Sequence, residues 1–276
     1  MPLSIILLAG ALCDVRTQDE FSELVMEAYV AQESKVSVFT TMVGLVKFGY
    51  RRLPSDTVRR CFLYCLLFPG DEAIPVKDLI IFWKLDGMIQ EARDSHEANC
   101  GDKEILRSLL KHGFIHFEGD DHIRMHDVIR ETVSRLGRDN GFVEQPERYF
   151  DEDIRFEYLA KLGERISLMN TIKEQLCGSP SLECFSTSML LLRGNRHMRT
   201  ISEEFFCHLR MLRVLDLSFT RIIILPQSIS CLLYLQLLLL VGCGHLEKIQ
   251  HIGSLEKLEV LNASGCWLRE SIKDGP

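Results

Sequence analysis

Apolar residues recur at helical spacing through the first half of the chain, and a repeating leucine pattern replaces them in the second half. The first 50 residues predict three helices joined by polar segments. Their expected ranges are 3–12, 19–31 and 37–48. The first of these is almost wholly apolar, so we expect a buried helix there.

A second group of helices is predicted after residue 54. Ser55 or Asp56 caps the first of them, and its apolar positions from Val58 to Leu66 follow helical spacing. The next covers 76–85, with a proline in its first turn and a glycine after its end. The third begins at Asp102 and has leucines and isoleucine on one side.

A β-hairpin and a closing helix follow this group. Two short apolar runs, 114–117 and 122–125, flank a polar turn and predict two strands. Asp127 is expected to cap the closing helix. Three helices, a hairpin and a helix are the element order of a winged helix.

The second half of the chain repeats a leucine frame. Leu212-x-x-Leu215-x-Leu217-x-x-Thr220 recurs with a period of 23 to 25 residues, and Asn, Cys or Thr occupies its last position. The frames begin at Gly163, Thr187, Leu212, Leu235 and Leu258. This is the period of a leucine-rich repeat, in which each unit gives a short strand and must stack to bury its leucines. The last polar residue is expected to hydrogen-bond the loop backbone.

The sequence therefore predicts a multi-domain chain that is mainly α and then α/β. Residues 1–50 form a helical part, 51–145 a winged helix, and 150–276 a solenoid of about five repeats, the last incomplete. The residues that flank the inward leucines are expected on the exposed, concave face. Among them are Val214, Asp216, Leu237 and Leu239. Two exposed leucines there indicate a surface for a protein partner, or only a solenoid that is too short.

Charge and composition narrow the classes of function. The formal net charge is −7 and the isoelectric point about 5.8, which argues against a broad nucleic-acid-binding surface. A winged helix can bind DNA, and four arginines could contact phosphates. They are Arg51, Arg52, Arg59 and Arg60. We favour a solvated helix face for them and expect no nucleic-acid partner.

The ten cysteines are scattered and predict reduced thiols rather than a disulfide framework. The apolar run 3–12 could be mistaken for a secretory signal, but no basic residue precedes it. It is also shorter than the roughly 20 residues that cross a bilayer, so we expect no membrane span. The cysteine–histidine spacings fit neither a zinc finger nor an activated nucleophile, so we expect no metal site and no catalytic residue.

Several motifs carry a resemblance to a known family. They are the segment 61–69 (Cys-Phe-Leu-Tyr-Cys-Leu-Leu-Phe-Pro), Leu79-Ile80 with Trp83, Gly87-Met88-Ile89, Met125-His126-Asp127-Val128 and the repeats that follow. In this order they resemble plant nucleotide-binding leucine-rich-repeat disease resistance proteins of the coiled-coil class. Pro2-Leu3 resembles the end of that family's Gly-Leu-Pro-Leu motif.

The resemblance implies a function and site residues. Residues 1–50 would be the ARC1-like subdomain and 51–145 the ARC2-like subdomain of a cytoplasmic switch that ADP holds closed and ATP opens. His126 would approach the β-phosphate of ADP, and Pro2 would pack near the adenine. The repeats would contact a pathogen effector or a guarded host protein, and the chain would also contact the nucleotide-binding domain of the complete receptor.

The chain departs from the family pattern in one decisive respect. It contains no G-x-x-x-x-G-K-[ST], the loop whose backbone and lysine cradle phosphates. We therefore expect weak or absent nucleotide affinity for this chain, and we interpret it as a fragment truncated at both ends. The alternative is a stand-alone repeat scaffold or decoy that binds no nucleotide.

Overall fold

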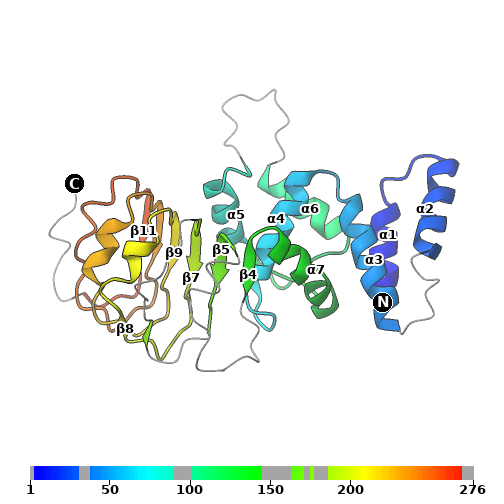
Figure 1. Ribbon diagram of the computed structural model, residues 1–276. Coiled ribbons are helices and arrows are strands. Elements are labelled where there is room, and N and C mark those ends of the chain that lie inside the picture. Colours follow the sequence, from blue (N-terminus) through cyan, green and yellow to red (C-terminus); the bar gives the residue numbers. More distant parts are fainter. Residues whose placement is uncertain are drawn as a thin grey trace. The chain divides into compact units, whose positions relative to one another are not determined.

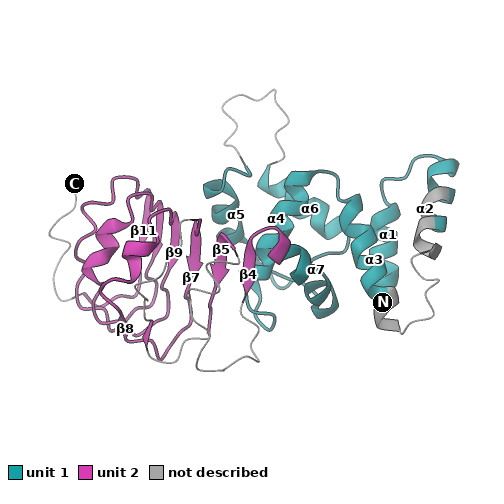
Figure 2. Ribbon diagram, viewed as in Figure 1, with its two compact units in different colours: residues 1–137 teal, residues 138–276 magenta. Residues whose placement is uncertain are grey.

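The computed structural model describes residues 3–30, 38–89, 101–144, 163–170, 175–176 and 186–268. They fall into two compact units, residues 1–137 and residues 138–276 (Figure 2). The order anticipated from the sequence, helices first and a mixed α/β solenoid second, is confirmed at this level. Among the described residues, no helix has the length and apolar character needed to cross a bilayer.

The first unit begins with the three expected helices, α1 (Leu3–Leu12), α2 (Gln18–Val30) and α3 (Val38–Arg52). Helix α1 packs against α3 and buries Leu7. Its other side is open, since Ile5 is 53% exposed. The expectation of a buried first helix therefore holds for one face only.

Five further helical elements, four α-helices and one 3₁₀ turn, complete this unit's helical core. They are α4 (Asp56–Leu63), the 3₁₀ turn η1 (Tyr64–Leu67), α5 (Val76–Leu85), α6 (Asp102–Lys111) and α7 (Asp127–Asp139). Ser55 caps α4, because its hydroxyl oxygen accepts from the Val58 N–H at 3.2 Å. Phe62 and Trp83 are fully buried, and the Trp83 indole N–H donates to the Cys61 carbonyl at 3.0 Å. This bond lets a large polar aromatic ring occupy the core.

A small antiparallel sheet lies beside these helices. Its strand order is β1 (Ile74–Pro75), β3 (His122–Arg124) and β2 (His116–Phe117). The predicted hairpin is thus confirmed, with shorter strands. Strand β1 was not anticipated, because two residues before a helix carry no alternating pattern.

The second unit is a solenoid built on a parallel sheet (Figure 1). Its strands, in spatial order, are β11 (Val260–Asn262), β10 (Leu237–Leu239), β9 (Val214–Asp216), β7 (Met189–Leu191), β5 (Arg165–Ser167) and β4 (Phe142–Glu144). Each predicted frame contains one strand. Strand β4 is additional, and it pairs in register with β5 although its residues precede the expected start of the repeats at 150.

On the side of the solenoid away from this sheet, the repeats contain shorter elements. They are β6 (Gln175–Leu176) paired with β8 (Thr200–Ile201), and the 3₁₀ turns η2 (Phe205–His208) and η3 (Gln227–Cys231).

The solenoid core follows the leucine frame. Leu190, Leu215 and Leu238 are aligned across neighbouring strands and fully buried. The polar frame residues bind backbone carbonyls, as predicted. The Asn195 amide donates to Leu168 and Leu192 at 2.8 and 2.7 Å, the Thr220 hydroxyl to Leu217 at 2.8 Å, and the Cys243 thiol to Leu217 at 3.1 Å. Buried carbonyls at each turn are thereby satisfied.

Candidate functional site

His126 lies exposed at the start of α7, directly after β3. The Val128 N–H donates to its Nδ1 at 3.2 Å, and its own carbonyl accepts from the Ile129 and Arg130 N–H groups at 2.9 and 3.0 Å. His126, not Asp127, therefore caps the helix. The expected cap at Asp127 is wrong by one residue, because Asp127 is already helical.

The capping hydrogen bond determines which nitrogen of the neutral imidazole carries the proton. In a neutral ring, the nitrogen that accepts a hydrogen bond carries no proton, so the proton lies on Nε2. Since the side chain is exposed, Nε2–H is available to a ligand. The site offers one outward N–H donor beside the N-terminus of a helix.

The nearby arginines have internal partners. Arg124 pairs with Glu118 through Nε–Oε2 and Nη2–Oε1 contacts of 2.5 and 3.0 Å, and it donates to the Asp71 carbonyl at 3.0 Å. The Arg124 guanidinium also holds the pKa of Glu118 below its usual value. Arg130 donates to the Cys65 and Leu66 carbonyls at 3.0 and 3.3 Å. Pro2, the other expected nucleotide contact, lies outside the described residues.

The expected partner surface on the repeat sheet is not exposed. Leu237 is 0%, Val214 and Asp216 are 1%, and Leu239 is 9% exposed. Each has in-register neighbours on both sides; Leu237, for example, lies between Val214 and Val260. Strands about 4.8 Å apart bring such side chains into contact across the sheet. The expectation of exposed leucines here is wrong, and the exposed residue of this row is Val260, at 42%.

Polar residues just before the strands form a ladder that the sequence reasoning missed. Arg213 Nε donates to Gln236 Oε1 at 3.1 Å, and Gln236 Nε2 donates to Glu259 Oε1 at 2.9 Å. These contacts are exposed and 23 residues apart. The equal spacing of the three residues could have revealed the ladder. Tyr234 lies nearby in sequence, 44% exposed, with the Lys257 ammonium 4.0 Å from its ring centroid.

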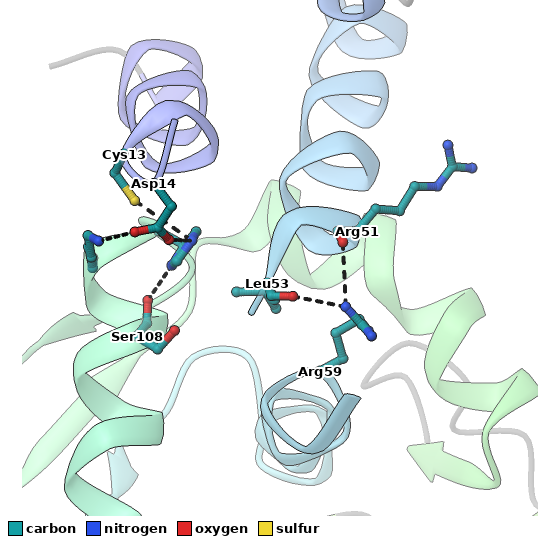
Figure 3. A network of polar contacts seen from close by, with 8 residues as sticks. Cys13, Asp14, Arg51, Leu53, Arg59 and Ser108 are labelled. Atoms are coloured by element: carbon teal, nitrogen blue, oxygen red, sulfur yellow. Dashed lines mark hydrogen bonds and ion pairs between the residues drawn. The ribbon is translucent and has the colours of Figure 1, made fainter. Parts of the chain in front are cut away.

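A second cluster joins residues far apart in the sequence (Figure 3). His112 Nε2 lies 3.8 Å from the Cys13 sulfur and 3.4 Å from Asp14 Oδ2, while His112 Nδ1 is 2.8 Å from the Ser108 carbonyl. The three side chains could together hold a metal ion. However, the Lys111 ammonium lies 2.5 Å from Asp14 Oδ1 and lowers the pKa of that carboxyl group, whereas burial raises the pKa of Cys13. A bound ammonium and a protonated thiol both oppose metal binding.

Known proteins are similar to the chain over both of its units. The chain is 30% identical over 285 residues to probable disease resistance protein At1g12290 of Arabidopsis thaliana, covering 96% of the chain and 32% of that protein. It is 34% identical over 242 residues to disease resistance protein RFL1 of the same organism, covering 84% and 27%. The chain belongs to the family of plant disease resistance proteins. No family model matches it.

The similarity to these relatives spans both units of the chain. Probable disease resistance protein At1g15890 of Arabidopsis thaliana aligns with 99% of it at 29% identity. The chain spans between 27% and 32% of the length of these three relatives.

One of the four arginines that a DNA-binding interpretation needs has a structural role instead. Arg59 Nη1 donates to the Leu53 and Arg51 carbonyls at 2.9 and 3.4 Å (Figure 3). Its Nε lies 3.3 Å from Asp56 Oδ1. The guanidinium thereby satisfies carbonyls at the end of α3, where a cation is also favoured by the helix dipole.

Proposed function

We propose that the chain is the regulatory and recognition part of a plant immune receptor. The observation that carries this proposal is the similarity to disease resistance proteins over the helical unit and the solenoid together. A stand-alone repeat scaffold would need only the solenoid, so similarity over 96% of the chain disfavours it. The role is binding and switching in the cytoplasm rather than catalysis. Burial raises the pKa of the Cys65 thiol to about 12, which leaves this one cysteine inert as a nucleophile.

We propose that the solenoid binds a pathogen effector or a host protein that the receptor monitors. The strand residues that flank the inward leucines, such as Val214 and Leu237, are buried. The exposed residues just before each strand are therefore better placed to contact a protein partner. The ladder Arg213–Gln236–Glu259 and the neighbouring Tyr234 supply hydrogen-bonding groups and an aromatic ring there. Polar rims around aromatic residues are common at protein interfaces.

The helical unit contributes to an ADP/ATP switch through His126. Its outward Nε2–H suits a phosphate oxygen, but a single donor does not replace a backbone cradle and lysine, which this sequence lacks. The nucleotide would therefore be held by the nucleotide-binding domain of the complete receptor, and His126 would add one contact that favours the ADP-bound, closed state. The helical unit would transmit the effect of that contact to the repeats.

Two experiments test the nucleotide role. Calorimetric titration of this chain with ADP and Mg²⁺ is expected to give no heat of binding up to about 100 μM ligand. The reason is that the chain lacks the backbone loop and the lysine that would hold the phosphates. Binding at micromolar concentration would contradict the assignment of the cradle to another domain.

The second experiment separates the cap from the ligand contact in the complete receptor. His126→Ala removes both, whereas His126→Ser keeps an oxygen that accepts from Val128 and removes only the imidazole donor. Both variants should raise defence-gene expression in leaf tissue without a pathogen, while the exposed neighbour variant His122→Ala should not. If His126→Ser behaves as the unmodified receptor, His126 is only a helix cap.

A further inference from the structure

Two cysteines of consecutive repeats meet on the side of the solenoid away from the parallel sheet. Cys207 lies in η2 and Cys231 ends η3. Their sulfur atoms are 3.5 Å apart, and both side chains are partly exposed. Neither residue belongs to the leucine frame or to the polar ladder, so the fold does not require them.

The backbone holds these two turns against each other. The Phe206 N–H donates to Ser228 Oγ at 3.4 Å, and the Gln227 N–H donates to Glu203 Oε2 at 3.0 Å. The two sulfurs lie 3.5 Å apart, so the side chains already point toward each other. A disulfide bond is about 2.05 Å long, so side-chain rotation has to close a gap of roughly 1.5 Å.

We propose that Cys207 and Cys231 form a reversible disulfide by exchange with a low-molecular-weight disulfide such as oxidised glutathione. The thiolate of one cysteine attacks a glutathione sulfur, which forms a mixed disulfide and releases one glutathione thiolate. The second cysteine, as thiolate, then attacks the protein sulfur of that mixed disulfide and releases the other glutathione. Two protein thiols are oxidised, one glutathione disulfide is reduced, and the two protons end on the released thiols.

The surroundings of each cysteine determine how fast it exchanges with glutathione and which cysteines react. Burial, followed by the neighbouring Cys231, raises the pKa of Cys207, so the exchange should accelerate as the pH rises. Cys243 and Cys266 also belong to consecutive repeats, but Cys243 is fully buried and its thiol donates to the Leu217 carbonyl at 3.1 Å. Glutathione cannot reach it, so this second pair provides an internal comparison.

The bond would couple two neighbouring repeats. Because each repeat contacts only its neighbours, a covalent link between two of them strengthens one interface of the array. It also constrains the unfolded chain between residues 207 and 231. We expect the melting temperature of the solenoid to rise by about 5 °C on oxidation and to return to its original value with dithiothreitol.

The test uses the whole chain in buffers of varied oxidised-to-reduced glutathione ratio, followed by alkylation and peptide mapping. The unmodified protein should lose both thiols together, remain monomeric and give a linked peptide that contains Cys207 and Cys231. Cys231→Ser should stop at a glutathione adduct on Cys207, and Cys266→Ser should oxidise as the unmodified protein does. The proposal is overturned by a stable glutathione adduct on Cys207 or Cys231 of the unmodified protein, by linkage of either cysteine to a different one, or by dimers cross-linked through them.

Discussion

At the scale of single residues, the imidazole of His126 caps a helix and could also make the phosphate contact proposed above. Its Nδ1 accepts from the Val128 N–H, so in the neutral ring the proton lies on Nε2, which the cap does not use. A capping role and a ligand role, which exclude each other when only the sequence is considered, are compatible in this tautomer. The Met-His-Asp motif is thus compatible with both a helix cap and a ligand contact at His126.

The capping role predicts a stability difference between two variants. His126→Ala should lower the free energy of unfolding of the helical unit by about 1 kcal/mol, because the Val128 N–H loses its acceptor. His126→Ser should lower it much less. Urea unfolding followed by circular dichroism measures both, and equal losses would mean that the imidazole contributes through some contact other than the cap.

Asp14 predicts a dependence on pH. The hydrogen bond from Lys111 lowers the pKa of Asp14 in the folded state. A lowered carboxyl pKa contributes stability above the unfolded value of about 3.9, and that stability is lost as the pH falls through the folded pKa. At pH 7, Asp14→Asn should lower the melting temperature by about 1–3 °C, a small effect because the pair is exposed.

Thermal unfolding across the pH range checks this expectation. The two melting temperatures should converge only as the pH falls through the lowered pKa of folded Asp14, below the usual carboxyl value of about 3.9, because Asp14 is then neutral as well. A difference that persists at low pH would assign the effect to packing rather than to charge. Asp121→Asn is a suitable control, because its contact with Lys77 is longer, at 3.9 Å.

At the scale of elements, the burial of the sheet rows can be tested directly. Leu237→Ala should cost about 2–5 kcal/mol of unfolding free energy, since Leu237 is fully buried and its removal leaves a cavity. Val260→Ala, in the same row but 42% exposed, should cost less than about 1 kcal/mol. Similar small losses for both variants would restore the exposed surface that the sequence alone suggests.

The elements that the sequence predicts well are those whose causes are local. Proline and glycine punctuation gives α5 its bounds, 76–85, and the leucine frame locates β9 and the carbonyl contact of Thr220. Strand β1 is defined by a partner far along the chain, since Ile74 pairs with Ile123. Strand β4 lies one repeat period before β5, but its segment lacks the leucines of the frame. The contact between Cys13 and His112 joins positions 99 residues apart, which a single sequence does not reveal.

At the scale of the whole molecule, the two tryptophans report on different units. Trp83 is fully buried in the first unit, and Trp267 is 81% exposed in the second. Native fluorescence should therefore contain one component that iodide quenches and one that it does not. Trp267→Phe should remove the quenchable component and leave Trp83 as a probe of the helical unit, and quenching that survives this substitution would contradict the burial of Trp83.

The in-register stacking of the repeats has a consequence for how such genes change. Val214 and Leu237, 23 residues apart, are direct neighbours in the sheet, and Met189 precedes Val214 in the same row. Unequal recombination that deletes residues 214–236 would place Leu237 beside Met189 and leave the alternation of faces intact. Loss of a single residue would instead invert every later side chain of that strand. Such a lineage can lengthen or shorten its solenoid in whole units while each surviving strand keeps its face.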